Sequence, residues 1–403
     1  MVLNEKMKII TILTLLSFFS FLQLNIIINL DTNTNTDMEV VVVEKIILKN
    51  SGYWNLTGTP ISINDSNPSK SWAYTASTYD WCSGSGTWND PYLIENVLID
   101  GQDAIAIEIY DSNSYFILRN CTIFNSAIYW DDSGMRIDGV SNGYITNNNL
   151  SNSRVAMILS NSNNNTIYGN LIKNNEDDGI VLWDNCHNNS IIKNNIESHS
   201  QHGIVLYDNC NYNIIKENFL KNNNGSDFFD SGIFLRDCLY NTIKNNNISQ
   251  CGGDDVYSAG LAIQRGQSNT ISNNQINGNS FFGVLIASSD ENTIIENIIE
   301  ENKWNGVVLS NAKDNIIINN QINDNGLFGI GFHGATFCVN NIIVGNTINR
   351  NNLSGIVLGE TSNYNLIANN TINRTIPGRF NLGYGEILLS YGIILNNGIN
   401  NTV

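Results

Sequence analysis

The chain contains few of the residues on which several common kinds of protein depend. Only 4 of its 403 residues are proline and only 14% are charged, with 20 Lys and Arg against 37 Asp and Glu, a net charge of −17. Nucleic-acid binding needs clusters of Lys and Arg that contact phosphates, so the composition argues against a nucleic-acid partner. The seven cysteines include no C-x-x-C pair, which excludes a zinc ribbon.

Asparagine, by contrast, is far above its ordinary usage, at 73 of 403 residues. Asparagine is unfavourable inside helices and suits turns and left-handed backbone positions. A long helical protein is therefore not expected.

A phrase of the form N-x-I-x-x-N recurs nine times. Its first residue is, in turn, Asn165, Asn189, Asn213, Asn241, Asn269, Asn292, Asn315, Asn341 and Asn365. The residue two places later is always Ile, the residue five places later is always Asn, and the residue seven places later is Ile or Leu. A second phrase, a glycine followed by alternating apolar residues, begins at Gly179, Gly203, Gly232, Gly260, Gly283, Gly306, Gly329 and Gly355, with degenerate copies from Ala106, Gly134 and Ala156. The most regular spacings are 22 to 24 residues, which marks an internal repeat.

The apolar positions alternate with period two in short runs, which is typical of strands. Glycine and asparagine separate the runs, where we expect turns with positive φ. A unit this small cannot bury its apolar face alone, so it must stack on its neighbours. Stacked Ile columns would then form the interior, and stacked Asn amides would bond to the coils above and below.

The sequence therefore predicts an all-β fold, a single-stranded right-handed parallel β-helix of about ten to twelve coils with an N-terminal β cap. A leucine-rich repeat is the main alternative. It needs L-x-x-L-x-L followed by N-x-L, and no helical segment completes the unit here.

The stretches NTIYGNLIKNNEDDGIVL and NSIIKNNIESHSQHGIVL resemble the NosD-like β-helix repeat family. That family lies within the pectin-lyase-like superfamily and carries the CASH domain, named for carbohydrate-binding proteins and sugar hydrolases. The stretch GSGTWNDPYLIENVLIDG also resembles the first segment of such helices. The resemblance covers about residues 84–400 and implies the fold more specifically than the activity, because this fold hosts many functions.

The NosD name implies copper-site maturation, which the composition does not favour. After the N-terminal segment only Met38, Met135 and Met157 remain, with four scattered histidines, whereas soft-metal sites use clustered Met, Cys or His. We expect no cofactor. The alternative, implied by the lyase relatives, is a bound Ca²⁺ acting with a basic residue, here Arg236 or Arg265.

Three segments follow from these patterns. Lys6 and Lys8 precede an uncharged apolar run over residues 9–30, which predicts a signal peptide or an uncleaved membrane anchor over residues 1–30. We assign residues 31–100 to the N-terminal cap and first segment, with strands in MEVVVVEKIIL and WNLTGTPISI, and residues 101–403 to the β-helix. The protein is then extracellular or at the cell surface, and it contacts a membrane only through an uncleaved N-terminal segment.

Cys186 and Cys210 occupy the same place in successive repeats. Free cysteine is among the most buried residue types, so buried stacked thiols are the favoured interpretation. A disulfide between the two is the alternative.

Positions two and four after each glycine should face outward. The first column is apolar and contains Val181, Val205, Phe234, Ala262, Leu285 and Val308. An exposed apolar stripe marks a binding face, unless a loop or another strand covers it. The second column contains Trp183, Tyr207, Arg236 and Gln264, and Asp184, Asp208 and Asp237 follow one place later.

Two insertions, NNNGSDFFDS and QCGGDDVYSA, leave the same edge of neighbouring coils, and the two preceding coils carry Glu176, Asp177, Asp178 and His202 in that turn. Function tends to lie on loops of a rigid scaffold. We therefore predict a ligand-binding site at Trp183, Asp184, Tyr207, Asp208, Phe234, Arg236, Asp237, Asp230, Asp254 and Asp255.

Aromatic faces beside carboxylates suit sugars, so we expect non-enzymatic binding of a glycan or another cell-surface component. One alternative is a polysaccharide lyase or glycoside hydrolase, in which Asp230 and Asp255 reach the separation of a catalytic carboxylate pair. No complete catalytic motif is present, and no catalytic residue is assigned. The other alternative is a structural stalk or adhesin-like spacer.

Overall fold

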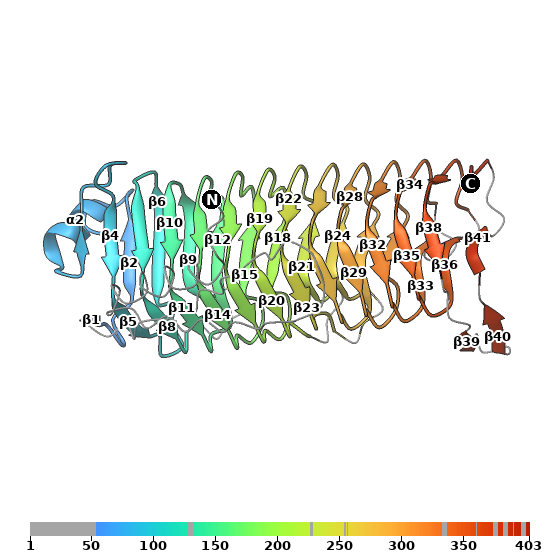
Figure 1. Ribbon diagram of the computed structural model, residues 1–403. Coiled ribbons are helices and arrows are strands. Elements are labelled where there is room, and N and C mark those ends of the chain that lie inside the picture. Colours follow the sequence, from blue (N-terminus) through green and yellow to red (C-terminus); the bar gives the residue numbers. More distant parts are fainter. Residues whose placement is uncertain are drawn as a thin grey trace, which may run out of the picture. The chain divides into compact units, whose positions relative to one another are not determined.

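The computed structural model describes residues 54–403, except 127–131, 226–228, 254, 256, 333–336, 360, 374–377, 382–385, 390 and 396–399. The predicted signal or anchor and the strand expected in MEVVVVEKIIL lie outside these residues. Within the unit formed by residues 50–403 the chain winds through three sheets of 13 strands each (Figure 1). Among the described residues, no helix is long and apolar enough to cross a membrane.

Sheet A contains one strand from each coil. Its strands, in spatial order, are β1 (Trp54–Asn55), β5 (Val97–Asp100), β8 (Thr122–Phe124), β11 (Asn149–Ser151), β14 (Leu171–Lys173), β17 (Asn195–Glu197), β20 (Phe219–Lys221), β23 (Asn247–Ser249), β26 (Gln275–Asn277), β29 (Ile298–Glu300), β32 (Gln321–Asn323), β35 (Thr347–Asn349) and β38 (Thr371–Asn373).

Sheet B contains the strands of the glycine phrase. They are β2 (Ile61–Asn64), β6 (Ile107–Ser112), β9 (Ser133–Val140), β12 (Val155–Ser160), β15 (Ile180–Trp183), β18 (Ile204–Tyr207), β21 (Ser231–Arg236), β24 (Ala259–Gln264), β27 (Phe282–Ala287), β30 (Val307–Ser310), β33 (Phe328–Phe332), β36 (Ser354–Leu358) and β41 (Tyr391–Leu395).

Sheet C contains the first Ile column. Its strands are β3 (Cys82–Ser83), β4 (Tyr92–Glu95), β7 (Phe116–Arg119), β10 (Gly143–Thr146), β13 (Thr166–Tyr168), β16 (Ser190–Ile192), β19 (Ile214–Lys216), β22 (Thr242–Lys244), β25 (Thr270–Ser272), β28 (Thr293–Ile295), β31 (Ile316–Ile318), β34 (Ile342–Val344) and β37 (Leu366–Ala368). A separate antiparallel pair joins β39 (Gly378–Asn381) to β40 (Glu386–Leu389).

The Ile columns stack in register, as predicted. Ile191 pairs with Ile215, and Ile215 pairs with Ile243, in parallel strands of sheet C. All three side chains are fully buried in one continuous apolar core. The right-handed parallel β-helix is therefore confirmed.

Asparagine side chains connect each coil to the coils on both sides of it. Asn213 Oδ1 accepts from the backbone N–H of Asn189 at 2.8 Å, while its Nδ2 donates to Asn241 Oδ1 at 3.1 Å and to the Cys186 carbonyl at 2.9 Å. The predicted stacking of Asn amides is confirmed, and the second Asn of the phrase forms an equivalent ladder. Asn401 Oδ1 extends the first ladder by accepting from Asn365 N–H at 2.9 Å.

A third ladder runs beside the glycines and was not predicted. Its members are Asn175, His199, Asn223, Cys251, Asn279, Asn302, Asn325 and Asn351, all buried. His199 and Cys251 interrupt the asparagines in sequence. His199 still accepts from the Asn175 N–H through Nδ1 at 3.2 Å, so an imidazole can replace the amide oxygen in this role.

The glycines of the repeated phrase have a different role from the one predicted. Positive φ occurs mostly at Asn, Asp and other non-glycine turn residues, for example Asn245 at 55°. The glycines that begin the strands of sheet B have no positive φ. A Cβ on Gly306 would overlap the Cγ2 of Ile322 and lie 2.7 Å from the Gly329 carbonyl oxygen, so these positions require close approach between coils.

Residues 54–83 form the first strand of each sheet and one short helix. β1 pairs with β5 and β2 pairs with β6, so the stretch WNLTGTPISI forms strands as expected. The helix α2 (Trp72–Thr78), the one helix among the described residues, is an unexpected part of the cap. Its Trp72 is fully buried, with ring centroids 5.2 Å from Tyr92 and 5.1 Å from Phe116.

All seven cysteines are free and buried, so the disulfide alternative is wrong and the stacked-thiol interpretation is confirmed. Burial raises the pKa of Cys121 and of Cys251 to about 12, which keeps both as unreactive thiols at neutral pH.

We expect Gly306→Ala to lower the free energy of unfolding by about 2 kcal/mol or more, because the added methyl group forces neighbouring coils apart. Gly278→Asn is the matched control. Gly278 has a φ of 61° in open space, and asparagine occupies the equivalent turn elsewhere. Chemical denaturation followed by circular dichroism compares the two, and equal stability of both variants would contradict the close-approach role.

Candidate ligand-binding site

The outer face of sheet B brings together side chains that are far apart in the sequence. Trp183 pairs with Tyr207, Tyr207 with Arg236, and Arg236 with Gln264, in four successive coils. Trp183, Tyr207 and Arg236 are half-buried. The Arg236 guanidinium lies over the Tyr207 ring, 4.4 Å from its centroid. Aromatic and cationic groups therefore form a continuous column, here called the sheet B column.

The adjacent apolar stripe is not exposed, so of the two alternatives the covered stripe is the one that the structure supports. Val181, Val205, Phe234, Ala262, Leu285 and Val308 are all buried in a second apolar cluster, separate from the core. Trp183, Tyr207, Phe229, Tyr257 and Trp304 pack against this cluster and remain partly buried. The stripe supports the aromatic side chains around it and does not itself offer a ligand surface.

Aromatic rings from both insertions meet beside the sheet B column. Phe229 stacks on Phe234 at 5.5 Å and on Tyr257 at 5.1 Å. The His202 ring also stacks on Phe234 at 5.0 Å, and Tyr207 contacts Phe234 edge-on at 5.8 Å. Such pairs stabilise beyond the area they bury. The two insertions therefore pack together beside the sheet B column, as expected for insertions that leave the same edge of neighbouring coils.

Two carboxylates of this region accept hydrogen bonds from backbone groups. Asp178 Oδ1 accepts from the His202 N–H at 2.9 Å, and Asp255 Oδ1 accepts from the Tyr257 N–H at 2.9 Å. Asp230 is fully buried, and a Cβ on Gly253 would lie 2.9 Å from its Oδ2. Asp254 lies outside the described residues. Because Asp230 is enclosed and Asp255 orders its loop, the proposed acid and base pair has no support from these contacts.

Asp184, Asp208 and Asp237 occupy equivalent turns with φ of 52°, 52° and 56°. Asp237 accepts from Arg265 Nε at 2.8 Å and lies 3.9 Å from Arg236 Nε. The hydrogen bond from Arg265 lowers the pKa of Asp237. The Asp237 carboxylate is therefore ionised at neutral pH and joins the two arginines at the end of the column.

The Tyr207 hydroxyl is held in its protonated form. Burial raises its pKa, the carboxylates of Asp178, Asp230 and Asp208 raise it further, and Arg236 opposes them. A protonated phenol can donate a hydrogen bond to a ligand oxygen. Together with the guanidinium of Arg236, it gives the column donors as well as an apolar face.

The repeat register also places polar residues that the sequence analysis did not select. Glu108 pairs with Arg136 and Tyr110 with Asp138 on the same face of sheet B, two and four places after Ala106 and Gly134. Tyr110 Oη donates to Glu108 Oε1 at 3.1 Å, and burial is the main cause that raises the Tyr110 pKa to about 12. Applying the outward-column rule to the degenerate repeats would have found these residues.

In the part of the chain that the structure describes, no group of three or more His, Cys, Asp or Glu side chains is arranged to hold a metal ion. The column offers hydrogen bonds and flat apolar faces to a ligand.

Two buried histidines, His199 in the third ladder and His202 against Phe234, are expected to make stability depend on pH. Burial lowers the pKa of His199 to about 3 and that of His202 to about 4. Both therefore stay neutral when folded but gain a proton below about pH 6.5 when unfolded. Their contribution is fully present above pH 6.5 and is lost as the pH falls towards the folded values.

We expect wild type to lose about 2 kcal/mol more stability between pH 7 and pH 5 than His199→Asn. Asparagine restores the third ladder and does not titrate, while His202 remains in both proteins. Denaturation at the two pH values measures the difference. Identical pH dependence of the two proteins would show that His199 is not a buried neutral base.

Comparison with known proteins identifies the architecture. The sequence model described as right handed beta helix region matches residues 81–228, 214–280 and 231–403. Among curated proteins, no sequence matches the chain significantly.

Solved structures of similar fold include the A-module of a mannuronan C-5 epimerase from Azotobacter vinelandii. It has 18% identity and a TM-score of 0.51, over 79% of this chain and 87% of that one. The Dettilon tailspike protein has 16% identity and a TM-score of 0.54, over 72% of this chain and 65% of that one. At these identities the likeness concerns the fold.

Proposed function

The chain belongs to the right-handed beta helix family, and on this premise we propose that it binds a polysaccharide along the sheet B column. The observation that carries the proposal is the register of Trp183, Tyr207 and Arg236 in three successive coils. Neighbouring strands are roughly 4.8 Å apart, so an extended polymer lying along the column meets one side chain per coil.

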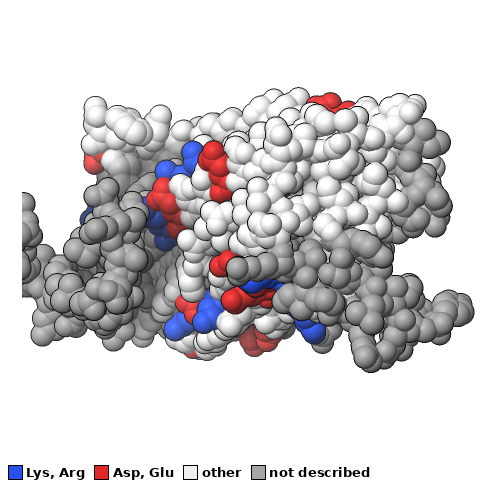
Figure 2. Space-filling view, turned by 45° about the vertical axis from the view of Figure 1, so that its right-hand side comes forward, with Lys and Arg blue, Asp and Glu red and all other residues white. Residues whose placement is uncertain are grey.

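The chemistry of the column suits hydroxylated rings. Trp183 and Tyr207 offer flat apolar faces, the Tyr207 phenol and Arg236 donate hydrogen bonds, and the Asp208 and Asp237 carboxylates accept them. On the face seen in Figure 2, charged side chains form a few clusters that mix both signs, and most of the described surface is uncharged. The net charge of −17 opposes a polyanion, so a largely neutral glycan suits the protein better.

The proposal extends to location, family group and cofactor. We propose that the protein is exported through residues 1–30 and acts outside the cytoplasm. We also propose that it is a member of the NosD-like group with a CASH domain, and that it needs no cofactor. The mannuronan C-5 epimerase is named for a polysaccharide, which makes polysaccharides the first ligand class to test.

The second candidate is an enzyme that acts on a polysaccharide, a lyase or a glycoside hydrolase. The observation in its favour is the guanidinium of Arg236 on the Tyr207 ring, with Asp178, Asp230 and Asp208 close enough to perturb that phenol. A phenol beside a cation is a candidate proton donor or acceptor. Binding remains the better supported function, because Asp178 and Asp255 hold backbone groups and Asp230 is fully buried.

We expect Trp183→Ala and Tyr207→Ala each to weaken polysaccharide binding about tenfold, since each removes a stacking face. A glycan array that includes neutral polysaccharides and mannuronan measures this. Tyr212→Asn is the matched control. Tyr212 is an exposed aromatic in a turn where other repeats carry asparagine, and it stacks on Tyr240 at 5.0 Å.

Unchanged binding in both column variants would remove the site. Absence of glycan binding by the wild type would favour a stalk or spacer. If the wild type releases reducing ends or unsaturated products from a polysaccharide and Tyr207→Phe does not, catalysis would replace binding as the function.

A further inference from the structure

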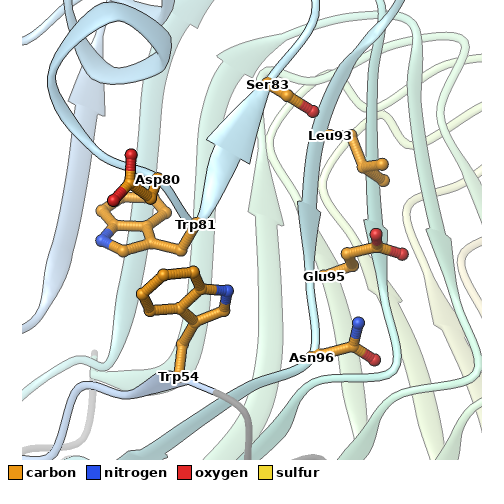
Figure 3. A pocket seen from close by; sticks show the side chains of 7 residues that line it. All are labelled: Trp54, Asp80, Trp81, Ser83, Leu93, Glu95 and Asn96. Atoms are coloured by element: carbon orange, nitrogen blue, oxygen red, sulfur yellow. The ribbon is translucent and has the colours of Figure 1, made fainter.

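A second site lies at the N-terminal end of the coils, on a part of the molecule that the sequence analysis did not select. An open pocket of about 340 Å³ is lined by Trp54, Asp80, Trp81, Ser83, Glu95 and Asn96, among others (Figure 3). This volume is at the lower end of the range for ligand pockets, so it suits one small ring.

The pocket forms where the non-repeating segment joins the first coil. Trp54 lies on β1, which pairs with β5 of sheet A, while Ser83 lies on β3, which runs antiparallel to β4 of sheet C. Trp54 and Trp81 pack against the main core, and Tyr79 stacks on Trp81 at 4.9 Å. The indoles are therefore held in place before any ligand binds, which lowers the entropy cost of binding.

The two walls of the pocket differ in chemistry. The indoles of Trp54 and Trp81 lie next to each other on one side, with Asp80 beside Trp81 (Figure 3). The other side carries Ser83, Leu93, Glu95 and Asn96 (Figure 3). This arrangement suits a flat ring with an apolar face and polar groups at its edge. A quaternary ammonium ion, in contrast, is bound within a cage of aromatic faces.

The charges of the lining select against anions. Arg119 contacts Glu95 through Nε and Nη2, both at 2.7 Å and both at Oε2, so Oε1 keeps its capacity to accept a hydrogen bond. Asp80 is exposed and forms no ion pair among the described residues. The lining therefore contains one carboxylate that is paired with an arginine, Glu95, and one that is not, Asp80. Together they favour ligands that donate hydroxyl hydrogen bonds and oppose uronates and phosphates.

We propose that this pocket binds a single neutral sugar unit, with one ring face on the indoles of Trp54 and Trp81 and ring hydroxyls donating to Asp80 and Glu95. The pocket is built from sheets A and C, whereas the sheet B column lies on another sheet and in later coils. Sugar binding at the pocket therefore does not depend on the proposed function, because it uses different residues and a different face.

The test uses saturation-transfer NMR and calorimetric titration of the purified protein with neutral mono- and disaccharides. We expect wild type to bind at least one of them, and Asp80→Asn to weaken that binding about fivefold or more, because it removes the charged hydrogen-bond acceptor. Trp81→Ala should abolish the binding. Asp80 is exposed, so its variant keeps the test valid even if Trp81→Ala fails to fold.

Two control variants distinguish sugar binding at this pocket from binding elsewhere on the protein. Trp88 is 77% exposed and packs edge-on against Tyr115, outside the pocket lining, so Trp88→Ala should leave binding unchanged. A loss of binding in Trp183→Ala, with binding by Trp88→Ala unaffected, would assign the sugar to the sheet B column instead. Tetramethylammonium and glucuronate serve as cation and anion probes.

Equal binding of neutral sugars by wild type, Asp80→Asn and Trp81→Ala would overturn the proposal. So would binding of tetramethylammonium or glucuronate at this pocket in the absence of any neutral sugar binding.

Discussion

The hydrogen-bonded asparagine ladder is the constraint on which the rest of the structure depends. Asn218 accepts from the Asn194 backbone N–H at 2.9 Å and donates to the Ile191 carbonyl at 2.8 Å and to Asn246 Oδ1 at 3.0 Å. A buried turn would otherwise leave backbone groups without partners. By satisfying them with an amide from the next coil, the ladder fixes the register that stacks the Ile columns and aligns the outer side chains.

Much of this architecture is predictable because a repeat determines which residues share a column. The alternation of apolar and polar residues around Ile191 and Ile215 distinguishes side chains that face the interior from side chains that face outward. Once successive repeats are aligned, Trp183 lies beside Tyr207. The repeat does not encode what packs on an outer face, so the sequence left open whether Val205 is exposed or covered. A glycine in the sequence does not show whether it is needed for a positive φ or for close approach between coils. The third ladder is not visible in the sequence, because its residue type changes at His199.

The sheet B column and the N-terminal pocket are built on the same scaffold, but only the column can be recognised as a pattern in the sequence. The sheet B column repeats with the coils, so its aromatic residues appear as a pattern. The pocket between Trp54 and Trp81 arises where non-repeating segments join the first coil, and neither residue belongs to a period. A rigid solenoid can therefore present separate candidate surfaces, one that follows the coils and one at the first coil.

The most direct test of the ladder's role is the free energy of unfolding of Asn218→Ala measured against Asn352→Ala. Asn218 is buried in the ladder, whereas Asn352 is exposed. We predict a loss of about 2 to 4 kcal/mol for Asn218→Ala, because the substitution leaves buried groups of two coils without partners. For Asn352→Ala we predict a change within about 0.5 kcal/mol. A similarly small change for both variants would contradict the central role of the ladder.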